Sequence, residues 1–116
     1  MADVPKCTWV GESGAKYIYF IHSLPITFDP GQNGNYIYSK KNDEGKWVPI
    51  YFGEGDLSGR VCEDHHQWAC IMKKGATHVH EHLNPREEDR TAEEADLLAN
   101  YTYAYKPNGC NEREGG

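Results

Sequence analysis

The sequence predicts an α+β domain, in which helices flank a small, mainly antiparallel β-sheet. Segments rich in β-branched and aromatic residues precede most of the helical segments, which is the order typical of this class. Two of these segments flank residues 41–45 (KNDEG), a run with strong turn composition, and they are expected to pair as an antiparallel hairpin. A chain of 116 residues has room for one such domain.

Four strands are expected along the chain. Residues 1–14 are rich in turn formers and are expected to be irregular, and residues 16–22 (KYIYFIH) form the first strand. Residues 35–39 (NYIYS) and 46–52 (KWVPIYF) form the hairpin, and Pro49 indicates an edge or a bulge in its second strand. Residues 77–83 (THVHEHL) supply the last strand.

Three helical segments are expected after the hairpin. The first opens at Asp56 and runs through Arg60, and the second covers residues 66–73 and ends at Gly75 as a C-cap. The third begins at about Glu87 or Ala92 and extends to Tyr101.

Charge and cysteine usage limit the class of protein. The net charge of −6 argues against a broad basic face that coats duplex DNA, and no apolar run approaches the ~18 residues of a membrane span. No secretory signal pattern opens the sequence and no two cysteines form a C-x-x-C pair, so free thiols in a cytoplasmic protein are expected. The four cysteines are Cys7, Cys62, Cys70 and Cys110.

Two hairpin tyrosines are the first candidate site residues. Alternation places Tyr36 and Tyr38 on one face of their strand and Ile37 on the other. Tyr51 ends the second strand before Gly53, which permits close approach of a ligand or backbone. A phenol acts as a general base only if a neighbouring cation lowers its pKa. Paired tyrosines on a hairpin are otherwise cross-strand packing.

Two charged residues on the predicted helices complete a candidate set. Arg60 follows Tyr51 by nine positions and could hold a phosphate through its guanidinium. Glu94 shares a helical stripe with Leu97 and Leu98, while Glu93 falls on the polar side. A carboxylate facing the packed side needs a partner such as Mg²⁺ or Mn²⁺. The alternative is that Thr91-Ala92-Glu93-Glu94 is a capping box.

Histidines supply two further candidates. His78, His80 and His82 alternate along the last strand and point to one face, where they could bind zinc or form a polar strand face. His65 and His66 follow the Arg60 segment, and either could supply a general base.

Taken in order, these residues resemble the GIY-YIG nuclease family over residues 33–112. Gly34-Asn35-Tyr36 stands in place of the first triplet, and Tyr51-Phe52-Gly53 in place of the second. The Arg60 segment, the Glu94 helix and the Pro107-x-x-Cys110-Asn111 turn follow in the family's order. The resemblance implies a single domain whose residues 1–32 are an extension that adds an edge strand, and whose residues 113–116 are a disordered tail.

The resemblance also implies functions for individual residues. Glu94 would bind one Mg²⁺ or Mn²⁺ ion, Tyr36 would act as base or position water, and Tyr51 would support it. Arg60 would clamp the scissile phosphate, and Asn111 would hold the site together by hydrogen bonds. His65 or His66 would fill the family's histidine position, and we predict that His66 does so. The substrate would be nucleic acid, DNA rather than RNA.

The sequence departs from the family pattern in three places. Asn35 replaces an aliphatic core residue, fifteen residues separate Tyr36 from Tyr51, and Arg60 comes one residue early. These departures leave two alternatives to a nuclease: a catalytically inactive module with the same fold, and a small zinc protein built on His78, His80 and His82.

Overall fold

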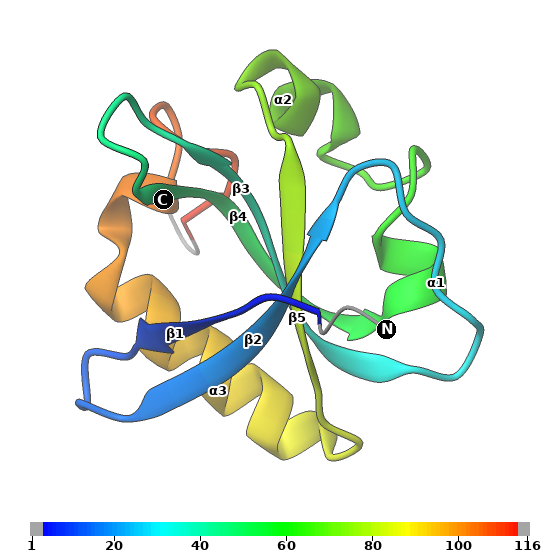
Figure 1. Ribbon diagram of the computed structural model, residues 1–116. Coiled ribbons are helices and arrows are strands. Elements are labelled where there is room, and N and C mark those ends of the chain that lie inside the picture. Colours follow the sequence, from blue (N-terminus) through cyan, green and yellow to red (C-terminus); the bar gives the residue numbers. More distant parts are fainter. Residues whose placement is uncertain (1–3, 114–116) are drawn as a thin grey trace.

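The computed structural model describes residues 4–113, which form a five-stranded sheet with helices on both faces (Figure 1). The strands are β1 (Lys6–Val10), β2 (Lys16–Ser23), β3 (Asn33–Lys41), β4 (Trp47–Asp56) and β5 (His78–Leu83). Their order across the sheet is β1-β2-β5-β3-β4, and each neighbouring pair is antiparallel. The predicted α+β class with an antiparallel sheet is confirmed.

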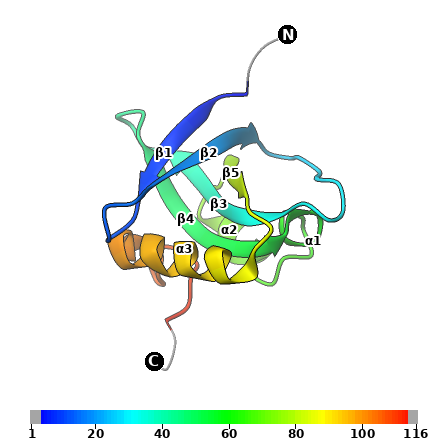
Figure 2. The ribbon, with the colours of Figure 1, turned by 90° about the horizontal axis from the view of Figure 1, so that it is seen from below.

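The sheet separates two layers of hydrophobic core, and helices cover both. The helices are α1 (Leu57–Arg60), α2 (Trp68–Lys73), α3 (Glu87–Asn100) and the short 3₁₀ helix η1 (Thr102–Ala104). Leu57 of α1 and Ile71 of α2 pack on one face of the sheet, whereas Leu97 and Leu98 of α3 pack on the other. Figure 2 shows α3 lying along its face of the curved sheet. No described helix is long and apolar enough to cross a membrane.

The β3–β4 hairpin follows the predicted pattern. Tyr36 belongs to the core layer under α1 and α2, and Ile37 belongs to the layer under α3, so the predicted alternation is confirmed. The pairing register shifts between Tyr38 and Ser39, opposite Pro49, which explains how an edge strand accepts a proline here. Asn35 is buried on the α3 face, where its amide donates to the Arg90 carbonyl at 2.9 Å.

The N-terminal segment differs from its prediction. Residues 6–10 are not irregular but form β1, in which Cys7 and Trp9 point inward. The strand was not predicted because an alternation over only five residues is too short to identify one. The strand expected at the sheet edge, β2, instead lies between β1 and β5. Trp9 and Tyr19 then contribute to the same core layer as Leu97, so the N-terminal strands pack with the rest of the sheet.

Helix α3 begins earlier than the predicted capping box allows. Arg86 is its N-cap, and the hydroxyl of Thr91 donates to the carbonyls of Glu87 and Glu88 inside the helix. The capping-box interpretation is therefore wrong. Glu93, assigned to the polar side, is 4% exposed. The reason is tertiary, because its carboxylate receives a hydrogen bond from Tyr19 and contacts His82 Nδ1 at 2.9 Å.

Candidate functional site

A cleft of about 750 Å³ lies along the outer edge of β4. Its walls come from four parts of the chain: β4, the connection before α2, one side of α3 and the C-terminal turn. The lining residues are Tyr51, His66, Gln67, Thr91, Glu94, Ala95, Leu98, Ala99, Tyr105, Asn111, Glu112 and Arg113. The fold thus brings Tyr51, His66, Glu94 and Asn111 of the predicted site to one concavity.

Tyr36 reaches this edge of the sheet because its neighbour on β4 is a glycine. Tyr36 pairs with Gly53, and a Cβ atom built on Gly53 would overlap the Tyr36 phenol. The phenol therefore lies across the β4 backbone and stacks beside Tyr51, with ring centroids 6.1 Å apart. The requirement for glycine at position 53 is a steric one.

The two phenols are both protonated in this setting. Burial raises the pKa of Tyr36 well above its ordinary value, and the neighbouring tyrosines add to the rise. Burial and the charge of Glu94 also raise the pKa of Tyr51, while the charge of Arg60 opposes the rise. Arg60 therefore does not compensate for burial, and neither phenol is a base without a further cation.

His65 orients the Tyr36 hydroxyl. The imidazole is 6% exposed, and its Nε2 lies 2.8 Å from Tyr36 Oη. Its Nδ1 accepts the Gln67 backbone N–H at 2.9 Å, so the neutral ring carries its proton on Nε2 and donates to Tyr36. Burial, with the charges of His66 and Arg60, lowers the pKa of His65 to about 4. The phenol proton of Tyr36 is directed to Tyr51, and this hydrogen bond lowers the pKa of Tyr51.

His66 occupies a different position from its neighbour. It is exposed, lines the cleft, and stacks on His65 with ring centroids 4.5 Å apart and planes 15° apart. We predicted His66 for the family's histidine position, whereas the residue that is hydrogen-bonded to Tyr36 is His65. A histidine pair offers no sequence signal that separates the buried ring from the exposed one.

Arg60 stands at the margin of this group. It is exposed, ends α1 and does not line the cleft. Its side chain covers Gly55, where an added Cβ would lie 2.8 Å from Arg60 Nε. The charge still lowers the pKa values of Tyr36, Tyr51 and His65, so the guanidinium acts on the same groups from one side.

Glu94 lines the cleft from α3 and is half-buried. Its charge raises the pKa values of Tyr36 and Tyr51, which places it within electrostatic range of both phenols. Within residues 4–113, no three His, Cys, Asp or Glu side chains form a group that could hold a metal ion. The cleft holds two carboxylates, Glu94 and Glu112, and this number fits Mg²⁺, which keeps several waters and is commonly held by one or two carboxylates and substrate phosphates.

Asn111 ties the C-terminal turn to β4. Its amide accepts the Phe52 N–H and donates to the Phe52 carbonyl, both at 2.9 Å. Phe52 lies between Tyr51 and Gly53, so this pair of hydrogen bonds fixes the backbone that carries both. Asn111 is 6% exposed, so the bonds lie largely out of water.

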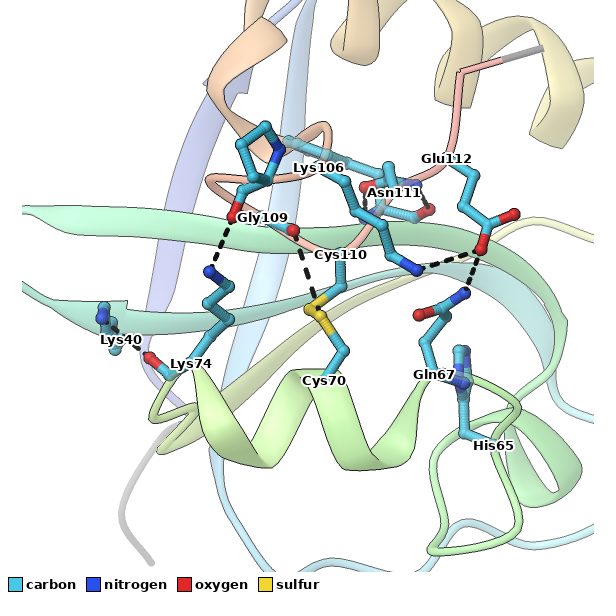
Figure 3. The surroundings of a disulfide bond; sticks show 12 residues. Lys40, His65, Gln67, Cys70, Lys74, Lys106, Gly109, Cys110, Asn111 and Glu112 are labelled. Carbon is cyan, nitrogen blue, oxygen red and sulfur yellow. Dashed lines mark hydrogen bonds and ion pairs between the residues drawn. A yellow bond between two sulfur atoms is a disulfide. The ribbon is translucent and has the colours of Figure 1, made fainter. Parts of the chain in front are cut away.

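A disulfide bond holds the same turn from the other side. Cys70 of α2 bonds Cys110, and Figure 3 shows the bond beside Asn111. The expectation of free thiols is therefore wrong for this pair and holds for Cys7 and Cys62. Forty residues separate the two half-cystines, so only the tertiary structure brings them together. Lys74 reinforces the link by donating to the Pro107 carbonyl at 2.6 Å.

The three histidines of β5 have separate partners. Nδ1 of His80, which is fully buried, accepts from Trp9 Nε1 at 3.0 Å, and its Nε2 contacts Ser39 Oγ at 2.9 Å. His78 packs edge-to-face against Trp47, and His82 pairs with Glu93. Because each ring is engaged elsewhere, the zinc alternative gains no support.

Comparison with known proteins assigns no family. No protein-family model, curated protein or solved structure matches the chain significantly. The GIY-YIG resemblance stays a prediction that depends on the residues and their arrangement.

Proposed function

We propose that this protein is a metal-dependent phosphodiesterase that acts on nucleic acid in the manner of a GIY-YIG nuclease. The observation that carries the proposal is the cleft along β4, where Tyr51, His66, Glu94 and Asn111 meet beside the Tyr36 phenol. Such a convergence of a carboxylate, phenols and an imidazole on one concavity is the geometry that a hydrolytic site requires.

Each residue has a defined task in this proposal. Glu94 would hold a Mg²⁺ or Mn²⁺ ion, which supplies Lewis-acid stabilisation of phosphate charge when bound. Arg60 would neutralise the scissile phosphate from the open side of the phenols. Asn111 keeps the Phe52 backbone, and with it Tyr51, in position.

Tyr36 is a hydrogen-bond donor in this scheme. Because His65 Nε2–H occupies one lone pair of the Tyr36 oxygen, the phenol proton is directed to Tyr51, with which Tyr36 is hydrogen-bonded. Tyr51 lines the cleft, and its own proton would then donate to a water molecule or a phosphate oxygen. The raised pKa of Tyr36 favours its donor function over that of a base at neutral pH.

The test is cleavage of labelled single-stranded, branched and duplex DNA, and of RNA, with Mg²⁺ or Mn²⁺. Wild-type protein should cleave at least one of these substrates, and Glu94→Gln should reduce cleavage to background while its circular dichroism and Tm stay unchanged. Glu87→Gln is the matched control, because Glu87 is exposed on the same helix away from the cleft. Absence of cleavage on every substrate would refute the enzymatic proposal.

A non-catalytic binding module is the second candidate. The net charge of −6 and the protonated state of the Tyr36 and Tyr51 phenols favour it. In that case nucleic acid should bind Glu94→Ala as tightly as wild type, and no turnover should be detected in either.

A further inference from the structure

The β4-edge cleft has two chemically different walls. One wall is apolar and consists of Ala95, Leu98 and Ala99 from α3, with Tyr105 from the C-terminal turn. The other wall is polar and consists of His66, Gln67, Asn111 and Glu112. Phosphodiester hydrolysis gives the polar wall a function but leaves the apolar wall without one. The apolar wall is suited to a second, uncharged part of the ligand.

Tyr105 offers a fixed ring at this apolar wall. Its backbone forms a β-bridge with Asn111, and its side chain packs against the core layer that contains Leu97. The guanidinium of Arg113 lies over the face of this ring, 4.3 Å from the centroid. An arginine plane held on a tyrosine is itself a surface on which a nucleobase stacks.

A duplex is expected to bind poorly in this cleft, because of both its geometry and its charge. A duplex turns its phosphates outward and keeps the faces of its bases stacked inside, so an apolar wall finds no base face to contact. Glu94 and Glu112 lie in the cleft, and the net charge of −6 gives a long phosphate backbone little attraction. An unpaired nucleotide exposes its base face and brings few phosphates.

We propose that the cleft takes an unpaired nucleotide whose base stacks against the Arg113–Tyr105 pair and the apolar side of α3. This inference rests on the proposed function in one respect, the position of the phosphate. The phosphate would lie toward Tyr51 and Glu94. The protein would then act on single strands, flaps or loops and not on continuous duplex.

The test measures binding apart from cleavage, by fluorescence anisotropy in EDTA. The probes are a labelled 12-nucleotide single strand, as DNA and as RNA, and a closed hairpin duplex. A single strand should bind at least about 10-fold more tightly than the hairpin. Tyr105→Ala should weaken single-strand binding by about 5- to 150-fold, since stacking of one base contributes about 1–3 kcal/mol.

Two variants serve as controls for Tyr105→Ala. Tyr105→Phe keeps the ring and should retain single-strand binding. Tyr103→Ala removes an exposed tyrosine outside the cleft and should change nothing. Equal affinity for hairpin and single strand, or wild-type binding by folded Tyr105→Ala, would overturn the inference even if the enzyme cleaves duplex DNA. Selective single-strand binding without any cleavage would instead remove the nuclease proposal and leave this inference intact.

Discussion

The phenol of Tyr36 lies directly across the Cα atom of Gly53. The two residues pair on neighbouring strands, and a Cβ atom at position 53 would occupy the space of the ring. This contact allows a buried tyrosine on the second strand from the edge to reach His65 and the side of the cleft. It also means that the need for glycine at position 53 can be tested by substitution.

We expect Gly53→Ala to lower the free energy of unfolding by about 1–3 kcal/mol, because the added methyl group must displace a packed ring. Urea unfolding measures the loss. Gly59→Ala is the control, since a Cβ there meets no atom within 4 Å and alanine favours the helix. It should be neutral or slightly stabilising, and equal losses in the two variants would contradict the steric explanation.

Asn111→Ala should cost about 1–3 kcal/mol of stability, because it leaves the buried N–H and carbonyl of Phe52 without partners. Chemical denaturation again measures the effect. Asn108→Ala, in the same turn and exposed, should change stability by less than about 0.5 kcal/mol. If Asn108→Ala is as damaging as Asn111→Ala, the hydrogen bonds to Phe52 are not the cause.

Reduction of the Cys70–Cys110 bond should lower stability by about 4 kcal/mol, the loop-closure entropy expected for a loop of this length. The measurement compares urea unfolding with and without a reducing agent. A Cys70→Ser/Cys110→Ser variant should match the reduced wild type and lose its response to reductant. Cys62→Ser should keep the full response, because Cys62 is a free thiol. A wild-type midpoint that ignores reductant would show that the bond does not form in solution.

Stability should fall as pH decreases from 6.5 toward 4. Burial lowers the pKa of His65 to about 4 and that of His80 to about 3, so the unfolded chain takes up protons first over this range. The stability gained by keeping these histidines neutral is fully present above pH 6.5. Below that pH, each histidine lowers the free energy of unfolding by up to about 1.4 kcal/mol per pH unit.

Urea unfolding at pH 7 and pH 5 measures this slope. Between these values the histidines dominate, because the pKa values of Asp96 and Glu112 are lowered by their hydrogen bonds. His65→Gln should show a smaller fall than wild type. A stability that is unchanged between pH 7 and pH 5 would mean that neither ring is held neutral by burial.

Local patterns predicted the elements that lie within one stretch of chain. The β3–β4 hairpin follows from two β-rich segments around a turn, and the alternation of Tyr36 and Ile37 follows from the strand period. Of the two starts expected for α3, Glu87 is confirmed, whereas the start at Ala92 depended on a capping box at Thr91-x-x-Glu94 that the helix does not use. Short β1 was missed because five residues carry too little periodicity.

The candidate site was likewise predicted in part from local patterns and decided in part by tertiary contacts. Tyr36, Tyr51, Glu94 and Asn111 were identified from order and spacing, and their positions around the cleft agree with that hypothesis without testing their chemistry. The choice between His65 and His66 depends on which imidazole is buried against Tyr36. The burial of Glu93 depends on Tyr19, which lies 74 residues away in the sequence.

The sequence by itself determined the class of the fold, the β3–β4 hairpin and the shared inward face of Tyr36 and Tyr38, because these depend on periodicity and turn chemistry between near neighbours. Only the tertiary structure decided the place of β1 and β2 in the sheet, the Cys70–Cys110 bond and the cleft beside β4. Each of these joins segments tens of residues apart. Such contacts depend on how whole faces pack, and no local pattern encodes them.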